Sequence, residues 1–242
     1  MFSLLGAIQD LLFPPLCLGC SRRLDHSRPP LFCADCLARL AFIGSPLCPC
    51  CGIPYSTGAD HLCATCLKNG YDFDLARSLL FYRQPMDELI LRLKYGGQLS
   101  GLQTLAALTA KSTCLHDLSP PDYIIPVPLH AKRIRRRGYN QATLLARGCF
   151  PQWQTELRLN ILLRDRLTTP QSQLSGKERR SNLKHVFSLN PHIALEGKTI
   201  LLVDDVLTTG STVNECAKIL RKGGAKRIEI FTIARSLGKN FW

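Results

Sequence analysis

This sequence is short of acidic residues and of long apolar runs. It has 18 Asp and Glu against 31 Lys and Arg among 242 residues, a formal net charge of +13. The imbalance is steepest over residues 130–184, where thirteen basic residues stand against three acidic ones, a local excess of +10. Such a segment suits a polyanion, either a phosphorylated small molecule or nucleic acid. A charged surface that only keeps the protein in solution is the alternative.

The lack of long apolar runs excludes a predicted membrane span. The apolar opening stretch, residues 1–15, is too short to cross a bilayer, has no basic segment before it and contains Asp10. We therefore expect a short amphipathic helix that ends at Pro14 and Pro15, with a signal peptide or a membrane-surface helix as the alternative. The protein is accordingly predicted to be cytoplasmic, with no stable membrane insertion.

Cysteine, in contrast, is abundant, but its layout is not that of a secreted disulfide scaffold. Cys114, Cys149 and Cys216 stand singly in apolar surroundings and are expected to be small core residues. Eight of the other nine cysteines form four pairs, each with two residues between the partners. These pairs are Cys17 and Cys20, Cys33 and Cys36, Cys48 and Cys51, and Cys63 and Cys66.

Two such pairs complete a tetrahedral shell of four thiolates around one Zn²⁺ ion. We assign one structural zinc to the first two pairs and one to the last two, as tandem zinc ribbons, with interleaved pairing or disulfides as alternatives. Cys50 could replace Cys51, but only Cys51 keeps the spacing and is followed by Gly52. A closed four-thiolate shell has no open position for catalysis.

From about Tyr71 onward the apolar pattern alternates between strand and helix. Strands are predicted over residues 76–83, 122–128, 198–205 and 227–235, and helices over residues 86–95, 102–111, 140–149 and 211–222. Strand–helix–strand units of this kind predict an α/β fold, a mostly parallel sheet flanked by helices.

Residues 200–212, ILLVDDVLTTGST, follow neither of two common phosphate-binding patterns. They lack the Gly-Lys of a P-loop and the three glycines of a dinucleotide-binding turn. A loop of small and hydroxyl-bearing residues instead enters a predicted helix N-terminus, which attracts a phosphate. Two acids, Asp204 and Asp205, come directly before it. This order suits vicinal hydroxyls next to a phosphate, as in a ribose 5-phosphate unit, whereas an ordinary strand–turn–helix corner is the alternative.

The same stretch resembles the phosphoribosyl pyrophosphate (PRPP) signature of type I phosphoribosyltransferases. The cysteine module, residues 126–142, residues 168–182 and the signature also occur in the order seen in the ComF family, which includes the GntX-type proteins. The resemblance implies a zinc-ribbon part over residues 1–70 and a phosphoribosyltransferase-like part over residues 71–242. It also implies PRPP, Mg²⁺ and two zincs as ligands, and a role in natural competence or DNA utilisation.

The resemblance also assigns site residues. Asp204 and Asp205 would hold the ribose hydroxyls, one of them through Mg²⁺ or water, and would be the catalytic pair if transfer occurs. The signature loop around the 5-phosphate comprises Val206, Leu207, Thr208, Thr209, Gly210, Ser211 and Thr212. The residues expected to face the pyrophosphate are Leu129, His130, Lys132 and Arg133. A loop that closes over PRPP in this fold would add Lys177, Arg179 and Arg180.

The basic stretch at residues 132–137 has more charge than one pyrophosphate needs, so we expect some of its residues to bind pyrophosphate and others to bind nucleic acid. Arg135, Arg136, Arg137 and the ring of Tyr139 are the predicted contacts to single-stranded DNA. Three functions remain open. They are a PRPP-binding DNA-handling factor, with partner proteins in DNA processing; an active phosphoribosyltransferase of unknown acceptor; and a non-catalytic docking protein.

Overall fold

A four-stranded parallel sheet forms the centre of the computed structural model, which describes residues 14–95, 100–166 and 186–237. The strand order is β1-β6-β5-β2. The strands are β1 (Leu75–Phe81), β2 (Tyr123–Pro126), β5 (Thr199–Leu207) and β6 (Arg227–Arg235). All three pairings are parallel.

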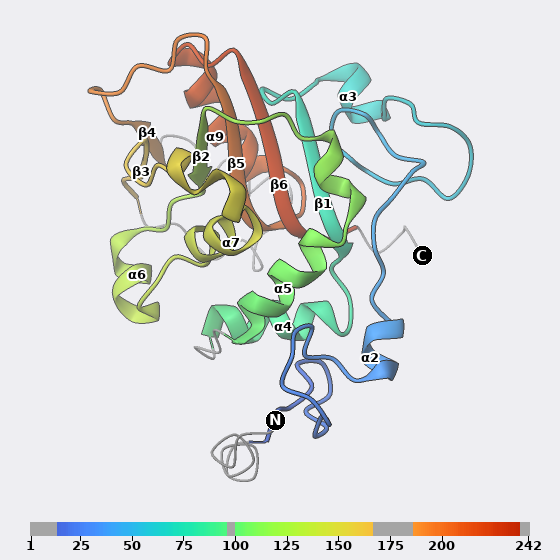
Figure 1. The fold of residues 1–242 in the computed structure, drawn as a ribbon. Helices are drawn as coiled ribbons and strands as arrows, with labels where there is room; N and C mark the ends of the chain where they lie inside the picture. The colour runs from blue at the N-terminus through green and yellow to red at the C-terminus, as the bar shows by residue number, and fades with distance from the viewer. Residues whose placement is uncertain (1–13, 96–99, 167–185, 238–242) are drawn as a thin grey trace.

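Helices cover both faces of this sheet (Figure 1). One face carries α4 (Met86–Tyr95), α5 (Ser100–Ala110) and α7 (Gln141–Cys149), and the other carries α9 (Ser211–Lys222). The strands are therefore apolar on both sides. In β5, Leu201 and Val203 join the core under α4, α5 and α7, whereas Ile200 and Leu202 join the core under α9.

The predicted fold class is confirmed, and most predicted elements agree with the structure to within two residues. Asn140 caps α7 by accepting a hydrogen bond from the backbone N–H of Ala142. The single cysteines Cys114, Cys149 and Cys216 are all buried. The predicted N-terminal helix lies largely in residues 1–13, outside the described residues.

The basic stretch, for which no helix was predicted, is helical. Residues Ala131–Arg137 form a helix of their own, α6, with His130 as its N-cap and Gly138, in the left-handed region at φ 85°, as its C-cap. The stretch has little apolar periodicity because Ile134 is its one large apolar side chain, and Ile134 is exposed. The helix is thus set by its two caps rather than by burial of an apolar face.

Smaller elements complete the part of the chain that the structure describes. They are α2 (Ala34–Ala38), α3 (Ala64–Lys68), the 3-10 helices η1 (Thr113–Asp117) and η2 (Pro151–Glu156), and the antiparallel pair β3 (Leu162–Arg164) and β4 (Phe187–Leu189). No helix among the described residues is long and apolar enough to span a membrane.

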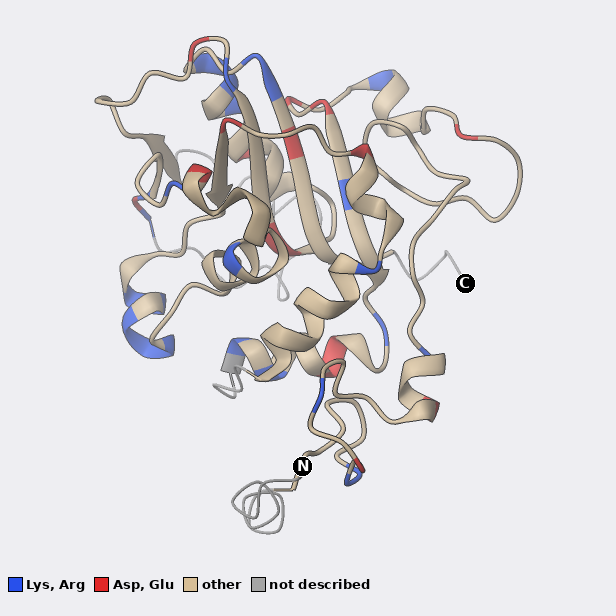
Figure 2. Ribbon diagram, viewed as in Figure 1, with Lys and Arg blue, Asp and Glu red and all other residues tan. Residues whose placement is uncertain are grey.

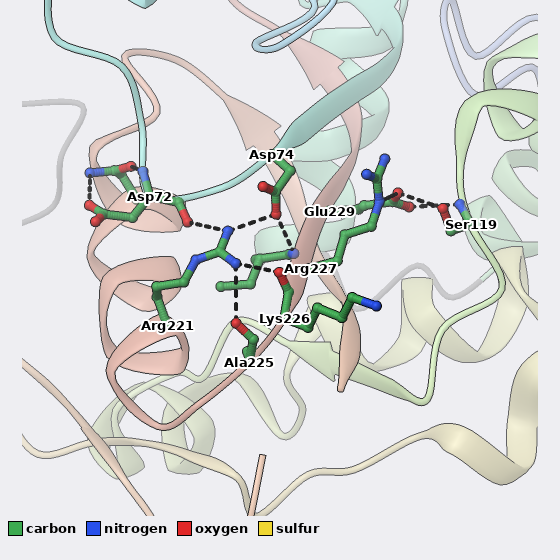
Figure 3. Close-up of polar contacts among 10 residues, drawn as sticks. Asp72, Asp74, Ser119, Arg221, Ala225, Lys226, Arg227 and Glu229 are labelled. Atoms are coloured by element: carbon green, nitrogen blue, oxygen red, sulfur yellow. Dashed lines mark hydrogen bonds and ion pairs between the residues drawn. The ribbon is translucent and has the colours of Figure 1, made fainter. Parts of the chain in front are cut away.

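The linker between the cysteine-rich region and β1 is bound to both ends of α9 (Figure 3). Asp72 exchanges two hydrogen bonds with Asn214 in the first half of the helix, at 2.8 and 3.1 Å. Asp74 forms an ion pair of 2.7 Å with Arg221 near the end of the helix and accepts the N–H of Ile228. The linker is thereby held along α9 before the chain enters the sheet.

A second group in the same view closes the edge of the sheet where the strands begin. Glu229 has a side chain only 1 % exposed. Its carboxylate accepts hydrogen bonds from the backbone and hydroxyl of Ser119 and from Arg227, at 2.6 to 2.9 Å. A buried carboxylate is stable when its lone pairs are occupied in this way.

Candidate functional site

The eight paired cysteines form two separate clusters, in the sequential pairing that the spacing predicts. Zinc site one consists of Cys17, Cys20, Cys33 and Cys36, and zinc site two of Cys48, Cys51, Cys63 and Cys66. Within each cluster all four sulfur atoms lie within 4.8 Å of one another, and none of these cysteines is in a disulfide.

The sulfur positions fit tetrahedral zinc. Bonds of about 2.3 Å place the sulfurs of a tetrahedral shell roughly 3.8 Å apart. The Sγ–Sγ distances are 3.7 Å for Cys20 and Cys33, and 3.6 Å for Cys51 and Cys63. Among the described residues, Cys51 and not Cys50 belongs to the second cluster. Structural zinc is thus supported at both sites.

The two zinc sites pack against opposite faces of the sheet. Cys17 and Cys36 belong to the core under α4, α5 and α7, whereas Cys48 and Cys51 belong to the core under α9. Between the two sites the chain lies along the edge strand β1, where Ile43 donates a hydrogen bond to the carbonyl of Leu79. The ribbons therefore share the cores of the sheet.

A cavity of about 380 Å³ lies beyond the carboxyl ends of β2 and β5. This is the edge at which α/β sheets bind ligands. Its walls come from α4, α6, α7, β3 and the turn between β5 and α9. Of the predicted site residues, the pocket is lined by Leu129, Arg133, Asp204, Asp205, Val206, Leu207, Thr208, Gly210, Ser211 and Thr212.

The two acids lie inside β5, which continues to Leu207 instead of ending at residue 205 as predicted. Successive residues of a strand point to opposite faces, so the two carboxylates have different neighbours. Asp205 points toward α4 and α7. Lys94 Nζ lies 2.9 Å from Asp205 Oδ2, and the Gln141 amide donates a hydrogen bond of 3.0 Å to the same oxygen.

Asp205 is therefore a largely buried carboxylate whose Oδ2 has two partners. Its side chain is 9 % exposed and that of Lys94 is 23 % exposed. Burial lowers the pKa of Lys94, but the Asp205 carboxylate outweighs this effect and leaves that pKa above its ordinary value. Lys94 is thus charged, and its ammonium shares Asp205 Oδ2 with the Gln141 amide.

Asp204 is less covered than Asp205, although both residues line the pocket. Burial and the adjacent Asp205 carboxylate raise the pKa of Asp204 to about 7, although the N–H of Asp205 and the charges of Lys94 and Arg164 act against the shift. A carboxylate that is costly to ionise by itself is strongly stabilised in its charged form by a divalent cation or a hydroxyl donor.

The phosphate loop, residues 208–212, joins β5 to α9. Gly210 is its pivot: it is buried, adopts the left-handed region at φ 76°, and caps α9 without a side-chain hydrogen bond. The hydroxyls of Thr209 and Ser211 share a hydrogen bond of 2.8 Å. The first N–H groups of α9 and these hydroxyls form an anion-binding corner.

Basic side chains form the opposite wall. Arg133 and Arg137 of α6, Arg164 of β3 and Lys94 of α4 all line the pocket, so four cations face two acids. Arg164 also stacks over the ring of Phe187 on β4, 5.1 Å from its centroid, a contact between the two paired strands. This charge balance favours a ligand with several negative charges.

Other predicted residues lie elsewhere. His130 caps α6 with its ring nitrogen 3.1 Å from the N–H of Lys132, and Lys132 is exposed. Thr209 is exposed at the tip of the phosphate loop. Lys177, Arg179 and Arg180 lie outside the described residues.

The predicted nucleic-acid residues separate into two groups. Arg135 and Arg136 are exposed on α6, whereas Arg137 lines the pocket and hydrogen-bonds to Gln141. The hydroxyl of Tyr139 donates to the carbonyl of Leu93, which attaches α6 to α4.

Sequence reasoning missed Lys94, Gln141 and Arg164. Lys94 is 111 residues from Asp205, inside a helix whose charged residues look like an ordinary solvent face. Gln141 stands directly after the Asn140 cap, and Arg164 lies in a three-residue strand without a motif. The excess of basic residues over residues 130–184 was a signal for Arg164, but not for Lys94 or Gln141.

Comparison with known proteins places these sites in context. A model of the double zinc ribbon domain matches residues 8–67, and a model of the phosphoribosyl transferase domain matches residues 134–240. Competence protein F of Haemophilus influenzae is 39 % identical over 228 residues, which cover 91 % of this chain and 96 % of that protein. DNA utilization protein YhgH of Escherichia coli K12 is 34 % identical over 237 residues, 94 % of this chain and 100 % of that protein. Competence protein ComFC of Bacillus subtilis is 29 % identical over 216 residues, 84 % of each chain.

Proposed function

Because the chain belongs to the ComF family of competence and DNA utilisation proteins, we propose that it binds PRPP with Mg²⁺ and handles single-stranded DNA during DNA uptake or use. In this proposal the zinc-ribbon part ends near residue 70, and the protein acts in the cytoplasm. The observation that carries the proposal is the composition of the pocket, where an acid pair, an anion-binding loop and basic side chains line one cavity.

In this proposal, each chemical group of PRPP lies against a different set of pocket residues. The 5-phosphate fits the phosphate loop, because N–H groups at a helix N-terminus and hydroxyls donate to phosphate oxygens. The ribose hydroxyls and Mg²⁺ fit Asp204, which lines the cavity and gains from a cationic or donor partner. The pyrophosphate fits the side lined by Arg133 and Arg137. Mg²⁺, when bound, neutralises pyrophosphate charge, and the arginines share that task.

Isothermal titration of the zinc-loaded full chain with PRPP and Mg²⁺ tests this binding. We expect one PRPP per chain, and we expect Asp204→Ala to weaken binding tenfold or more. Asp122→Ala is the matched control, because Asp122 pairs with Lys198 at the other end of the strands and lies outside the pocket. No binding by the wild-type protein, or equal loss in both variants, would remove the assignment.

Transfer of the ribose phosphate is a separate claim. Incubation of the protein with PRPP, Mg²⁺ and a panel of bases and amines tests it by release of pyrophosphate. Release that depends on one acceptor and is lost in Asp204→Ala would favour the phosphoribosyltransferase alternative. Binding without release would favour PRPP as a ligand or signal.

The DNA part of the proposal rests on α6. Figure 2 shows basic residues along this helix, and Lys132, Arg135 and Arg136 are exposed on it. Phosphate contacts from such side chains give salt-dependent binding with little sequence preference. The neighbouring Arg137 turns into the pocket, so one short helix serves both ligands in this proposal.

Fluorescence anisotropy with a labelled single-stranded oligonucleotide tests the DNA surface. Arg135→Glu combined with Arg136→Glu is expected to weaken DNA binding tenfold or more while PRPP binding stays within about twofold. Lys218→Glu combined with Lys222→Glu reverses the same charge at exposed positions of α9 and should leave DNA binding nearly unchanged. An equal loss in both double variants would indicate net charge rather than a surface on α6.

A further inference from the structure

Zinc site two and the phosphate loop lie on the same face of the sheet. The core under α9 contains Cys48 and Cys51 together with Leu207 and Val213, which flank the phosphate loop. Site one packs into the other core. The two zinc sites thus have different positions relative to the pocket, although their ligands are alike.

Tyr71 connects site two to the phosphate loop. It follows the zinc ligand Cys66 by five residues, and its ring packs against the core that contains Cys51. A methyl group placed on Gly210 would lie 3.3 Å from Tyr71 Cε1, so the ring covers the pivot of the loop. The ring is held from the other side by stacking on Phe73, with centroids 4.6 Å apart.

Two further contacts run between the same parts. Asp72, next to Tyr71, is hydrogen-bonded to Asn214 in the first half of α9. Arg235, the last residue of β6, donates a hydrogen bond of 2.5 Å to the carbonyl of Cys51, and its guanidinium lies 3.9 Å from the Cys51 sulfur. The adjacent residue Ser236 lines the pocket and donates to the carbonyl of Leu207.

Site one makes a different set of contacts. Leu31 donates a hydrogen bond to Thr104 of α5, and Ser21 accepts one from Arg92 of α4. Among the described residues, the hydrogen bonds of residues 14–40 lead to these two helices, to Gln84 just before α4 and to turns of the same segment, not to residues 208–212. Site one thus provides an internal comparison for site two.

We propose that Tyr71 is a positioning residue through which zinc site two holds the phosphate loop, so that zinc at this site and a phosphate-bearing ligand in the pocket bind cooperatively. The inference rests on the proposed binding of PRPP. Without zinc, the segment from Cys63 to Tyr71 loses its anchor and the ring no longer covers Gly210 in one position. Linkage is reciprocal, so a ligand that needs the ordered loop also retains the zinc.

Calorimetric titration of zinc-loaded full chains with PRPP and Mg²⁺ tests the role of the ring. Tyr71→Ala is expected to weaken PRPP binding roughly fivefold or more, the lower range of typical couplings between sites. Tyr71→Phe keeps the ring and should stay within about twofold of wild type. Tyr55→Ala is the matched control, because Tyr55 lies near site two but stacks on His61, with centroids 3.9 Å apart.

Zinc release to a chelator, followed with a metal-sensitive dye, tests the reciprocal effect. In Cys20→Ser combined with Cys33→Ser, which lacks site one, PRPP is expected to slow the release of the remaining zinc roughly fivefold or more. Tyr71→Ala should abolish this protection. If the site-one variant does not fold, the wild-type protein serves instead, where PRPP should protect one of two zinc equivalents.

The outcomes separate this inference from the proposed function. PRPP binding that is normal in both wild type and Tyr71→Ala, or zinc release that PRPP does not change, overturns the inference alone. A wild-type protein that does not bind PRPP overturns the proposed function and the inference with it.

Discussion

Replacing Lys94 by Met tests the buried ion pair beneath the pocket. The substitution keeps most of the side-chain stem but removes the ammonium that lies 2.9 Å from Asp205. The Asp205 side chain is 9 % exposed, and after the substitution the Gln141 amide still donates a hydrogen bond to its carboxylate. An uncompensated charge is left in a poorly solvated place.

The magnitude follows from that geometry. Breaking a buried ion pair by removing one partner costs about 3–5 kcal/mol. Because Lys94 is 23 % exposed and Gln141 still donates to the carboxylate, we expect about 2–3 kcal/mol of lost stability. For a protein of this length, 1 kcal/mol corresponds to roughly 2–4 °C, so the melting temperature should fall by about 4–12 °C.

Thermal unfolding of the zinc-loaded, ligand-free protein at pH 8 measures this change. The double variant Lys94→Met with Asp205→Asn removes both charges and should regain at least half of the lost stability, because no unpaired charge remains. A single variant that melts within 1 °C of wild type would refute the reasoning. So would a double variant that is less stable than the single one.

Three further outcomes are expected. Asp204→Asn should stabilise the ligand-free protein on the order of 2 kcal/mol at pH 8 and much less near pH 4. The pKa of Asp204 in the folded protein, about 7, lies above the ordinary 3.8, so the stability of the wild type falls as pH rises between those values. Urea unfolding at both pH values measures the difference. Gly210→Ala and Gly197→Ala should each reduce the stability by about 1 kcal/mol, because both positions have positive φ. Only Gly210→Ala, whose methyl group meets Tyr71, should also weaken PRPP binding in calorimetry. Glu229→Gln should cost about 2–3 kcal/mol in urea unfolding by disrupting the buried contacts with Ser119 and Arg227, and PRPP affinity should not change, since the pocket lies at the other end of the strands.

Local sequence patterns were sufficient to predict most of the central elements. Helix α4 over Met86–Tyr95, helix α9 over Ser211–Lys222 and strand β6 over Arg227–Arg235 all agree with their predicted limits. Their apolar residues repeat with the period of a helix or fill a strand that is buried on both faces. Cysteine spacing likewise predicted both zinc clusters, because thiolate pairs at one spacing fit a single tetrahedral ion.

The features that the sequence could not predict depend on tertiary contacts between residues far apart in the chain. The pairing of Lys94 with Asp205 depends on how α4 crosses the end of β5, and no local pattern describes that crossing. The packing of the two zinc sites on opposite faces depends in the same way on the chain between them lying along β1. Helix α6 was missed because its caps, rather than an apolar period, define it.

A crystal structure of the zinc-loaded protein with PRPP and Mg²⁺ is the most direct test of the central claim. The account predicts the 5-phosphate against the backbone of residues 209–212, the ribose next to Asp204, and the pyrophosphate on the side of Arg133 and Arg137. Lys94 should still pair with Asp205. PRPP bound at another place, or an empty pocket at a PRPP concentration that saturates the protein in solution, would contradict it.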